Sequence, residues 1–171
     1  MAGRTNEPVS RPVTAADAEW IVALHAAPHA RAFLPQPDVA DVVASIGRSD
    51  RIERIVADGD RCLALWRVVQ DESWLAEIRT IVVAEPGRGV GSIALRAALR
   101  WAFAERRVHR VCLSVTAANA RARRLYERHG FRLEGTWRDG FRNRDGGFED
   151  LCCYAVLEDD AAPATGADGD V

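Results

Sequence analysis

Apolar and polar residues alternate along this chain with a period that changes several times, and each change predicts a new element. Seven runs that are apolar throughout or at alternate positions predict strands at 9–13, 52–57, 63–69, 74–84, 108–115, 131–137 and 148–157. Four stretches with helical spacing or helix-start signals predict helices, at 14–27, 38–46, 89–106 and 119–129.

The helix predicted at 89–106 has the clearest pattern. Its apolar residues fall at i, i+3, i+4, i+7 and i+8 and form one stripe: Leu95, Ala98, Leu99, Ala102 and Phe103. The three strands before it are joined by short turns, which predict antiparallel hairpins. The order β-α-α-β-β-β-α-β-α-β-β therefore predicts a single α+β domain with a mixed, mostly antiparallel sheet.

The two ends of the chain lack these patterns. Residues 1–8 are expected to form a flexible N-terminal tail, and residues 158–171, with five acidic residues and no basic one, a disordered acidic C-terminal tail. The folded domain is thus expected to span 9–157. A length of 171 residues fits one domain.

The basic residues are unusual, because all 23 of them are Arg and none is Lys. A Walker A phosphate loop, a protein kinase and Schiff-base or pyridoxal-phosphate chemistry each need a Lys, so these classes are excluded in their standard form. The net charge is −2, but without the acidic tail the remaining chain has 23 basic and 20 acidic residues. A mildly basic domain suits an anionic ligand and gives little support for nucleic-acid binding.

The sequence shows no sign of a membrane-spanning segment or of a metal site. Residues 1–13 have no apolar signal core, and no apolar run approaches the length of a membrane span, so a cytoplasmic protein is expected. The four cysteines, Cys62, Cys112, Cys152 and Cys153, lack the spacing of a zinc site and fall in strand-like runs, where reduced core residues are expected.

A glycine-rich turn at 86–91 lies between a predicted strand and a predicted helix, which is the arrangement of an anion site. A dinucleotide-binding fingerprint is excluded, because Ser92 replaces its third glycine and no acid stands near Val111. Two interpretations remain from the residues alone. The turn is a plain tight connection, or it holds the pyrophosphate of a carrier cofactor.

Three parts of the chain resemble the GNAT superfamily of N-acetyltransferases. Gly89 and Gly91 match the glycines of its acetyl-CoA loop, whereas Pro86 stands where the family has Arg or Gln. Residues 119–131 resemble its Asn-x-x-Ala-x-x-x-Tyr-x-x-x-Gly-Phe helix. Residues 134–138 and 146–150 resemble the closing hairpin of the ribosomal-protein N-terminal acetyltransferase (Rim-type) branch. The resemblance covers about 9–157 and implies a GNAT-like fold with helices on both faces of the sheet.

The resemblance implies an acetyl-CoA-dependent N-acetyltransferase that transfers an acetyl group directly to a primary amine, of a protein N-terminus or a small molecule. It implies that Tyr126 protonates the departing sulfur and that a backbone N–H of Val82 or Val83 holds the carbonyl oxygen. No metal is implied. The residues expected to bind acetyl-CoA are Ile81, Val82, Val83, Arg88, Gly89, Val90, Gly91, Ser92, Asn119, Arg121 and Arg124.

Glu77 lies inside an apolar predicted strand, where a carboxylate is costly unless it is paired or in use. The resemblance implies a general base that takes the proton of the amine, and a structural ion pair is the alternative. Glu149 and Asp150 are further candidate acids. A non-catalytic module that binds acyl-CoA also remains open, because of Pro86, and the chain is expected to be a monomer or a homodimer.

Two further patterns have competing interpretations. The helix at 119–129 carries a run of arginines, Arg121, Arg123, Arg124 and Arg128. A nucleic-acid stripe and a solvated helix face are two interpretations of the run, and contact of Arg121 or Arg124, near the helix start, with nucleotide phosphates is favoured. His25 and His29 are four residues apart, as in a metal site, but Pro28 interrupts the helix, so a position at the surface or the edge of a pocket is expected. Three arginines of the last loop are expected to border the acceptor site: Arg138, Arg142 and Arg144.

Overall fold

The computed structural model describes residues 7–160 of the chain. The strands are β1 (Val9–Pro12), β2 (Arg51–Asp58), β3 (Arg61–Glu72), β4 (Leu75–Val83), β5 (Arg110–Thr116), β6 (Arg132–Arg142) and β7 (Phe148–Leu157). The α-helices are α1 (Ala18–Ala26), α2 (Pro28–Arg31), α3 (Val39–Ser45), α4 (Val90–Arg100) and α5 (Ala120–Arg128). Short helical turns are η1 (Ala15–Asp17), η2 (Trp101–Glu105) and η3 (Glu158–Asp160).

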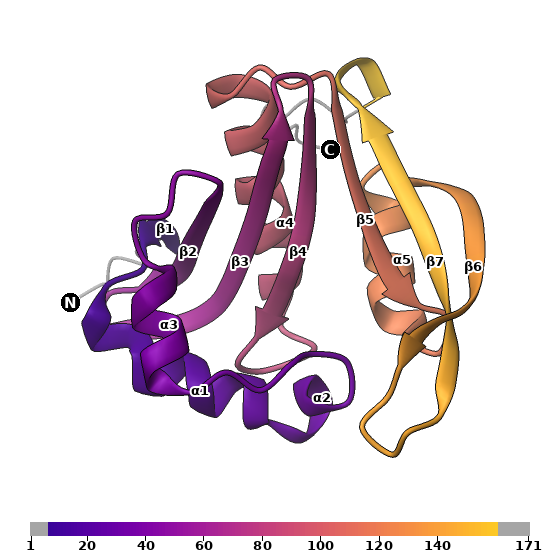
Figure 1. The fold of residues 1–171 in the computed structure, drawn as a ribbon. Coiled ribbons are helices and arrows are strands. Elements are labelled where there is room, and N and C mark those ends of the chain that lie inside the picture. The colour runs from indigo at the N-terminus through magenta and orange to yellow at the C-terminus, as the bar shows by residue number, and fades with distance from the viewer. Residues whose placement is uncertain (1–6, 161–171) are drawn as a thin grey trace, which may run out of the picture.

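The strands form one seven-stranded sheet in the order β1-β2-β3-β4-β5-β7-β6. Within the described chain, β4 and β5 are the one parallel pair, and all other neighbours are antiparallel. This pairing is short, because it joins only Leu75–Glu77 to Arg110–Cys112. Beyond it the two strands diverge and leave the sheet open at the lower end (Figure 1). The predicted mixed, mostly antiparallel sheet is thus confirmed.

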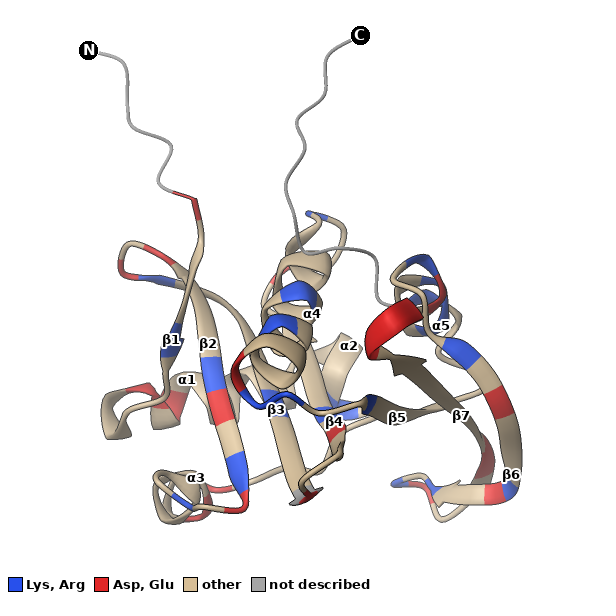
Figure 2. Ribbon diagram, turned by 90° about the horizontal axis from the view of Figure 1, so that it is seen from above, with Lys and Arg blue, Asp and Glu red and all other residues tan. Residues whose placement is uncertain are grey.

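Helices cover both faces of the sheet, as predicted. One apolar core lies between the sheet and α4, η2 and α5, and includes Trp66, Leu95 and Tyr154. The other lies between β2–β4 and α1–α3, and includes Ile21 and Leu65. Seen from above, α1 and α3 lie on one side of β2 and β3, and α4 lies on the other (Figure 2). The apolar stripe predicted for α4 is the face that packs on the sheet.

A β-bulge in β4 lies just past the point where β4 and β5 separate. Arg67 of β3 pairs with Thr80, whereas the next residue, Val68, pairs with Ile78, so Arg79 is the extra residue on β4. A bulge bends a strand and changes the direction in which its side chains point. The bulge therefore coincides with the start of the opening in the sheet.

Several predicted boundaries were wrong. No element was predicted between the helices at 14–27 and 38–46, but Pro28 begins α2, because proline is tolerated at the first position of a helix. The helix predicted at 89–106 ends as an α-helix at Arg100 and continues as the π-helical turn η2. The loop between the last two predicted strands, at 138–147, is shorter than predicted. The reason is that β6 extends to Arg142, across a register irregularity between Trp137 and Phe141.

The predicted tails lie mostly outside the described residues, which begin at 7 and end at 160. Residues 158–160, assigned to the acidic tail, form η3, and Asp160 accepts a hydrogen bond from Arg132 at 2.8 Å. None of the helices between 7 and 160 is long and apolar enough to cross a membrane. Charges of both signs alternate along β2 and β6 rather than forming a face of one sign (Figure 2).

His25 was expected at the surface or the edge of a pocket, but this was wrong: it is buried, and it ties α1 to the segment that follows α2. Its side chain is buried, with 1% exposed, and its Nδ1 lies 2.8 Å from the carbonyl oxygen of Pro35. Burial lowers the pKa of His25 below its usual value. Its Nε2 has no partner among residues 7–160, so a proton added there would be buried without a hydrogen bond.

We therefore expect acid to destabilise the protein through His25. The unfolded chain gains a proton below about pH 6.5, while the folded chain resists it, so the free energy of unfolding should fall as the pH decreases from that value towards the folded-state pKa. His25→Asn keeps a donor towards Pro35 and removes this titration, so urea unfolding at a series of pH values should show a smaller slope in the variant. Some slope will remain, because burial also lowers the pKa of His129. Equal slopes in both proteins would contradict the prediction.

Candidate functional site

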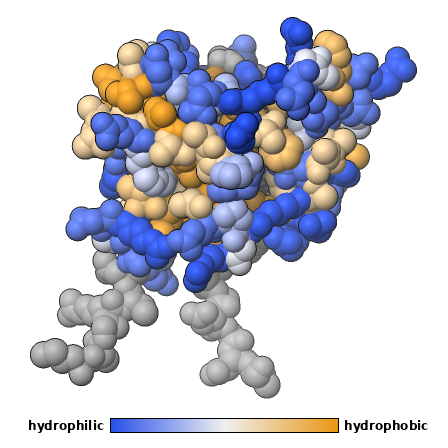
Figure 3. Space-filling model, turned by 90° about the horizontal axis from the view of Figure 1, so that it is seen from below, coloured by the Kyte–Doolittle hydropathy of each residue, from blue (hydrophilic) through white to orange (hydrophobic). Residues whose placement is uncertain are grey.

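A cavity of about 510 Å³ occupies the opening between β4 and β5. It is bounded by the end of β4, the loop and first turn of α4, the end of β5, α5, the segment around α2 and the β6–β7 hairpin. From below, apolar residues extend across the middle of this end of the molecule and hydrophilic residues border them (Figure 3). The cavity is thus the place where both faces of the sheet are accessible from one opening.

The glycine-rich turn forms one wall of the cavity. Gly89 has a φ of 75°, in the left-handed region that favours glycine, and a Cβ built on it would meet nothing within 4 Å. Gly91 is packed instead, because a Cβ there would lie 3.4 Å from Leu125 and 3.8 Å from Val83. Gly89, Val90, Gly91 and Ser92 all line the cavity at the N-terminus of α4, where the first backbone N–H groups lack helical partners. The N–H of Ser92 donates to the carbonyl of Gly89 at 2.9 Å.

The arginines predicted to meet phosphates differ in their placement. The Arg121 guanidinium lies over the turn, since a Cβ at Gly87 would be 3.8 Å from its Nη2, and Arg121 lines the cavity. Arg88 pairs with Glu85 at 3.0 Å, and its side chain is 73% exposed. Neither Arg88 nor Arg124 is among the described residues that line the cavity, whereas Arg128, which was not selected for this site, is.

Asn119 is the N-cap of α5, and its side-chain oxygen accepts a hydrogen bond from the N–H of Ala122 at 3.1 Å. The side chain also lines the cavity. One half of the amide thus fixes the start of the helix, and the Nδ2 half is left to donate into the cavity. Seven residues later on the same face lies Tyr126.

Tyr126 reaches the cavity from the core. Its side chain is buried, with 8% exposed, and its ring packs 5.8 Å from Phe131 and 6.4 Å from Tyr154, centroid to centroid. Burial raises its pKa to about 12, so the hydroxyl keeps its proton throughout the physiological range. That hydroxyl makes no hydrogen bond to any of the described residues, and Tyr126 lines the cavity.

The exposed edge of β4 faces the cavity. The geometry of the strand shows which of its backbone N–H groups point to this edge and which point to β3. Ala84 donates its N–H to Leu63 of β3 at 2.8 Å. Since successive N–H groups point to opposite sides of a strand, the N–H of Val82 also faces β3. The N–H groups of Ile81 and Val83 face the open edge. Val82 was predicted as an equivalent donor, and the alternation of the strand disfavours it.

Glu77 lines the cavity at the last position of β4 that pairs with β5, opposite Cys112. Its Oε2 lies 3.0 Å from Nη2 of Arg79, and its side chain is 27% exposed. The ion pair that the sequence offered as an alternative is therefore present. The carboxylate also remains within the cavity wall, so the pairing does not exclude a role as a base.

The segment around α2 and the β6–β7 hairpin close the cavity on the face opposite α4. His29 lies at the cavity edge, with Nε2 2.8 Å from the carbonyl oxygen of Val83. Arg144 donates a hydrogen bond to the carbonyl of Leu34 at 3.2 Å and joins the hairpin to this segment. Sequence reasoning missed Phe141, which lines the cavity, because its strand was predicted to end before it.

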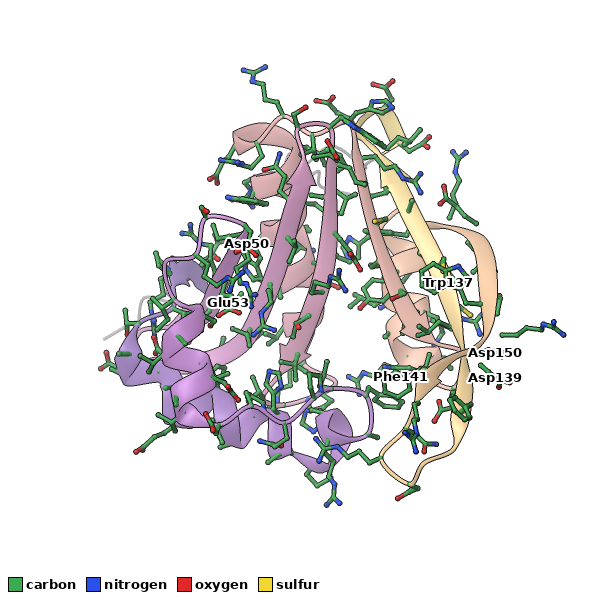
Figure 4. The ribbon with its side chains drawn as sticks, in the orientation of Figure 1. Asp50, Glu53, Trp137, Asp139, Phe141 and Asp150 are labelled. Atoms are coloured by element: carbon green, nitrogen blue, oxygen red, sulfur yellow. The ribbon has the colours of Figure 1, made fainter. Side chains whose placement is uncertain are left out.

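Two alternative acids on β7 point in different directions. Asp150 is exposed, and its Oδ1 accepts a hydrogen bond from the Asp139 N–H at 2.9 Å. Asp139 and Asp150 lie at the outer edge of the hairpin, whereas Phe141 points towards the cavity (Figure 4). Glu149 is two residues from Leu151, whose side chain lines the cavity, so the two share one face of the strand.

No group of three or more His, Cys, Asp or Glu side chains between residues 7 and 160 is arranged to hold a metal ion. The groups that line the cavity are backbone N–H groups, arginines, one buried phenol and carboxylates. Such a set can hold an anionic cofactor on one side and an amine on the other.

Comparison with known proteins agrees with this arrangement. The model of the acetyltransferase (GNAT) family matches residues 21–131. A spermidine N-acetyltransferase from Vibrio cholerae, in complex with CoA and spermine, superposes with a TM-score of 0.81 at 20% identity, covering 90% of this chain and 97% of that one. An acetyltransferase of the GNAT family from Streptococcus pneumoniae gives a TM-score of 0.74 at 22% identity, covering 88% and 99%. No curated protein sequence matched the chain.

Proposed function

The chain belongs to the acetyltransferase (GNAT) family and uses acetyl-CoA to acetylate an amine, and we propose that its acceptor is the primary amine of a small molecule. The observation that carries this proposal is the cavity between β4 and β5, which extends from the glycine-rich turn on one face of the sheet to the segment around α2 and the β6–β7 hairpin on the other.

The turn and α5 would hold acetyl-CoA. The N–H groups at the start of α4, beside Gly89 and Gly91, suit a pyrophosphate, and Arg121 adds a positive charge over the same turn. The Nδ2 group of Asn119 and the free edge of β4 supply donors for the amide-containing arm. Arg88 and Arg124 contribute less, because their side chains lie outside the cavity wall.

Acetyl-CoA supplies an acetyl group activated by its bond to sulfur. Around it, the N–H of Val83 or Ile81 would stabilise the charge that develops on the carbonyl oxygen. Glu77 would take the proton of the incoming amine, and Tyr126 would donate a hydrogen bond to the departing sulfur. These three groups belong to β4 and α5, which meet at the cavity.

The contact across the acceptor end of the cavity supports a small acceptor. The hydrogen bond between Arg144 and Leu34 joins its two sides, and Phe33 and Phe141 line the wall nearby. A slender amine passes such an opening more readily than the N-terminus of a folded protein. Free-thiol release from acetyl-CoA across a panel of small primary amines and peptides would test this. Release with peptides alone would contradict the proposed acceptor.

A protein N-terminus is the second candidate acceptor. It is favoured by residues 134–138 and 146–150, which resemble the hairpin of the Rim-type branch. Binding of acetyl-CoA without thiol release to any amine would instead indicate the non-catalytic module. We also propose that the folded domain spans 9–157, acts in the cytoplasm, where its cofactor and its four free cysteines fit, and is a monomer or a homodimer.

Gly89→Asp is expected to weaken acetyl-CoA binding by about tenfold or more, because it places a carboxylate beside the pyrophosphate. The side chain meets no neighbour within 4 Å, so the effect is one of charge rather than of a clash. Gly89→Asn is the matched control, since Asn has the same shape and tolerates a positive φ. Calorimetry should find the difference between the two variants, and equal affinities would show that the pyrophosphate lies elsewhere.

A further inference from the structure

Two buried oxygen atoms beside the cavity lack hydrogen-bond partners. They are Oγ1 of Thr116, in a residue with 4% exposed, and Oε2 of Glu149. Within residues 7–160 no ion pair to Glu149 is found, and its one hydrogen bond is a long one of 3.4 Å from Asn143 to Oε1. Buried oxygens are normally paired, so two unpaired ones at one place indicate a missing donor.

The strand register brings these oxygens together. Thr116 of β5 pairs with Leu151 of β7, and Glu149 lies two residues along β7 on the same face as Leu151. Thr116 and Glu149 are therefore diagonal neighbours, within reach of one group placed between them. Thr116 and Leu151 both line the cavity, so this face of the sheet forms its wall.

An aromatic ring lies beside the two unpaired oxygen atoms. Phe141 of β6 pairs directly with Glu149, shares its face, and lines the cavity. Figure 4 shows Phe141 directed towards the cavity. A carboxylate, a hydroxyl and an aromatic ring are the groups that recognise an ammonium ion, which donates several hydrogen bonds and is attracted to the ring face.

We propose that Thr116, Phe141 and Glu149 bind a second cationic group of the acceptor, so that the enzyme prefers linear diamines and polyamines over amines with a single charge. This proposal rests on the proposed function. Glu149 is then a specificity residue and not the base. From Cys112, opposite Glu77, to Thr116 is four residues of β5, or about 13 Å. The second cation would therefore lie within about that distance of the reacting amine.

The test compares linear diamines of increasing length with amino alcohols of the same length, which keep the reacting amine and replace the second cation by a hydroxyl. The wild-type enzyme should have a higher kcat/KM for one range of diamines than for the matched amino alcohols. Glu149→Gln should lower kcat/KM for those diamines by about 10- to 100-fold, through KM, and leave the amino alcohols unchanged. Thr116→Val should have a smaller effect in the same direction.

Asp139→Asn is the matched control, because it removes the same charge from the same hairpin at its outer edge (Figure 4). It should leave both substrate classes unchanged. An unaltered ratio of diamine to amino alcohol in Glu149→Gln would overturn the proposal, as would a wild-type enzyme without any preference for diamines. Should Glu149→Gln not fold, an unchanged ratio in Thr116→Val would overturn it. Absence of transfer to every amine by the wild-type enzyme would instead overturn the proposed function.

Discussion

Replacement of Tyr126 by Phe is expected to lower kcat about 100-fold, or about 2.7 kcal/mol at the transition state, with little change in folding or in acetyl-CoA affinity. The ring keeps its contacts with Phe131 and Tyr154. The hydroxyl forms no hydrogen bond to the described part of the chain, so its removal leaves no partner unpaired. Its loss should matter only when negative charge develops on the departing sulfur.

The raised pKa defines how Tyr126 acts. A phenol with a pKa of about 12 cannot transfer its proton easily to a thiolate whose conjugate thiol has a pKa near 8.5. Tyr126 should therefore stabilise the developing thiolate mainly as a hydrogen-bond donor. Since it loses its proton only near pH 12, it should cause no decline in rate on the alkaline side below about pH 10. A donor with a more acidic thiol needs less stabilisation and should recover much of the lost rate.

Tyr154→Phe is the matched control for Tyr126→Phe. Its hydroxyl, in the same aromatic cluster, donates to Glu127 at 2.7 Å and accepts from Arg123 at 3.1 Å, and it does not line the cavity. This variant should lose about 1 kcal/mol of stability and keep its kcat. A near-normal kcat in Tyr126→Phe, or an equal deficit with every leaving group, would contradict the assigned role.

The sequence predicted the parts of the site that depend on local spacing. Asn119 and Tyr126 line the cavity because seven residues are two helical turns, and Gly89 lies in the left-handed region because a tight turn precedes α4. The predicted loop, helix and strand order were therefore enough to indicate which residues line this side of the cavity.

The other parts depend on pairing and register, which local spacing does not specify. The bulge at Arg79 and the alternation of N–H groups along β4 distinguish Val83 from Val82. The acceptor wall joins residues far apart in sequence, as Arg144 and Leu34 do, and periodicity gives no indication of such contacts.

Glu77→Gln is expected to lower kcat by about 100- to 10,000-fold while acetyl-CoA affinity stays the same, because the variant cannot take the proton of the amine. The change keeps the size of the side chain and its position in the cavity wall. The residual rate should rise with pH, since the amine then loses its proton to solvent. A wild-type kcat with an unaltered pH profile would reduce Glu77 to a structural acid.

A variant of Arg79 distinguishes the two possible roles of Glu77, as a structural ion-pair partner or as the base. If the carboxylate served only to pair with Arg79, at 3.0 Å, then Arg79→Gln and Glu77→Gln would lower stability and activity by similar amounts. If Glu77 is the base, Arg79→Gln should keep a kcat within about tenfold of the wild type, because the carboxylate is still present, whereas Glu77→Gln should not. Half of the Arg79 side chain is exposed, so the pair itself should contribute no more than about 1 kcal/mol to stability. A large loss of rate in Glu77→Gln with a small loss of stability would thus identify the carboxylate as the group that accepts the proton.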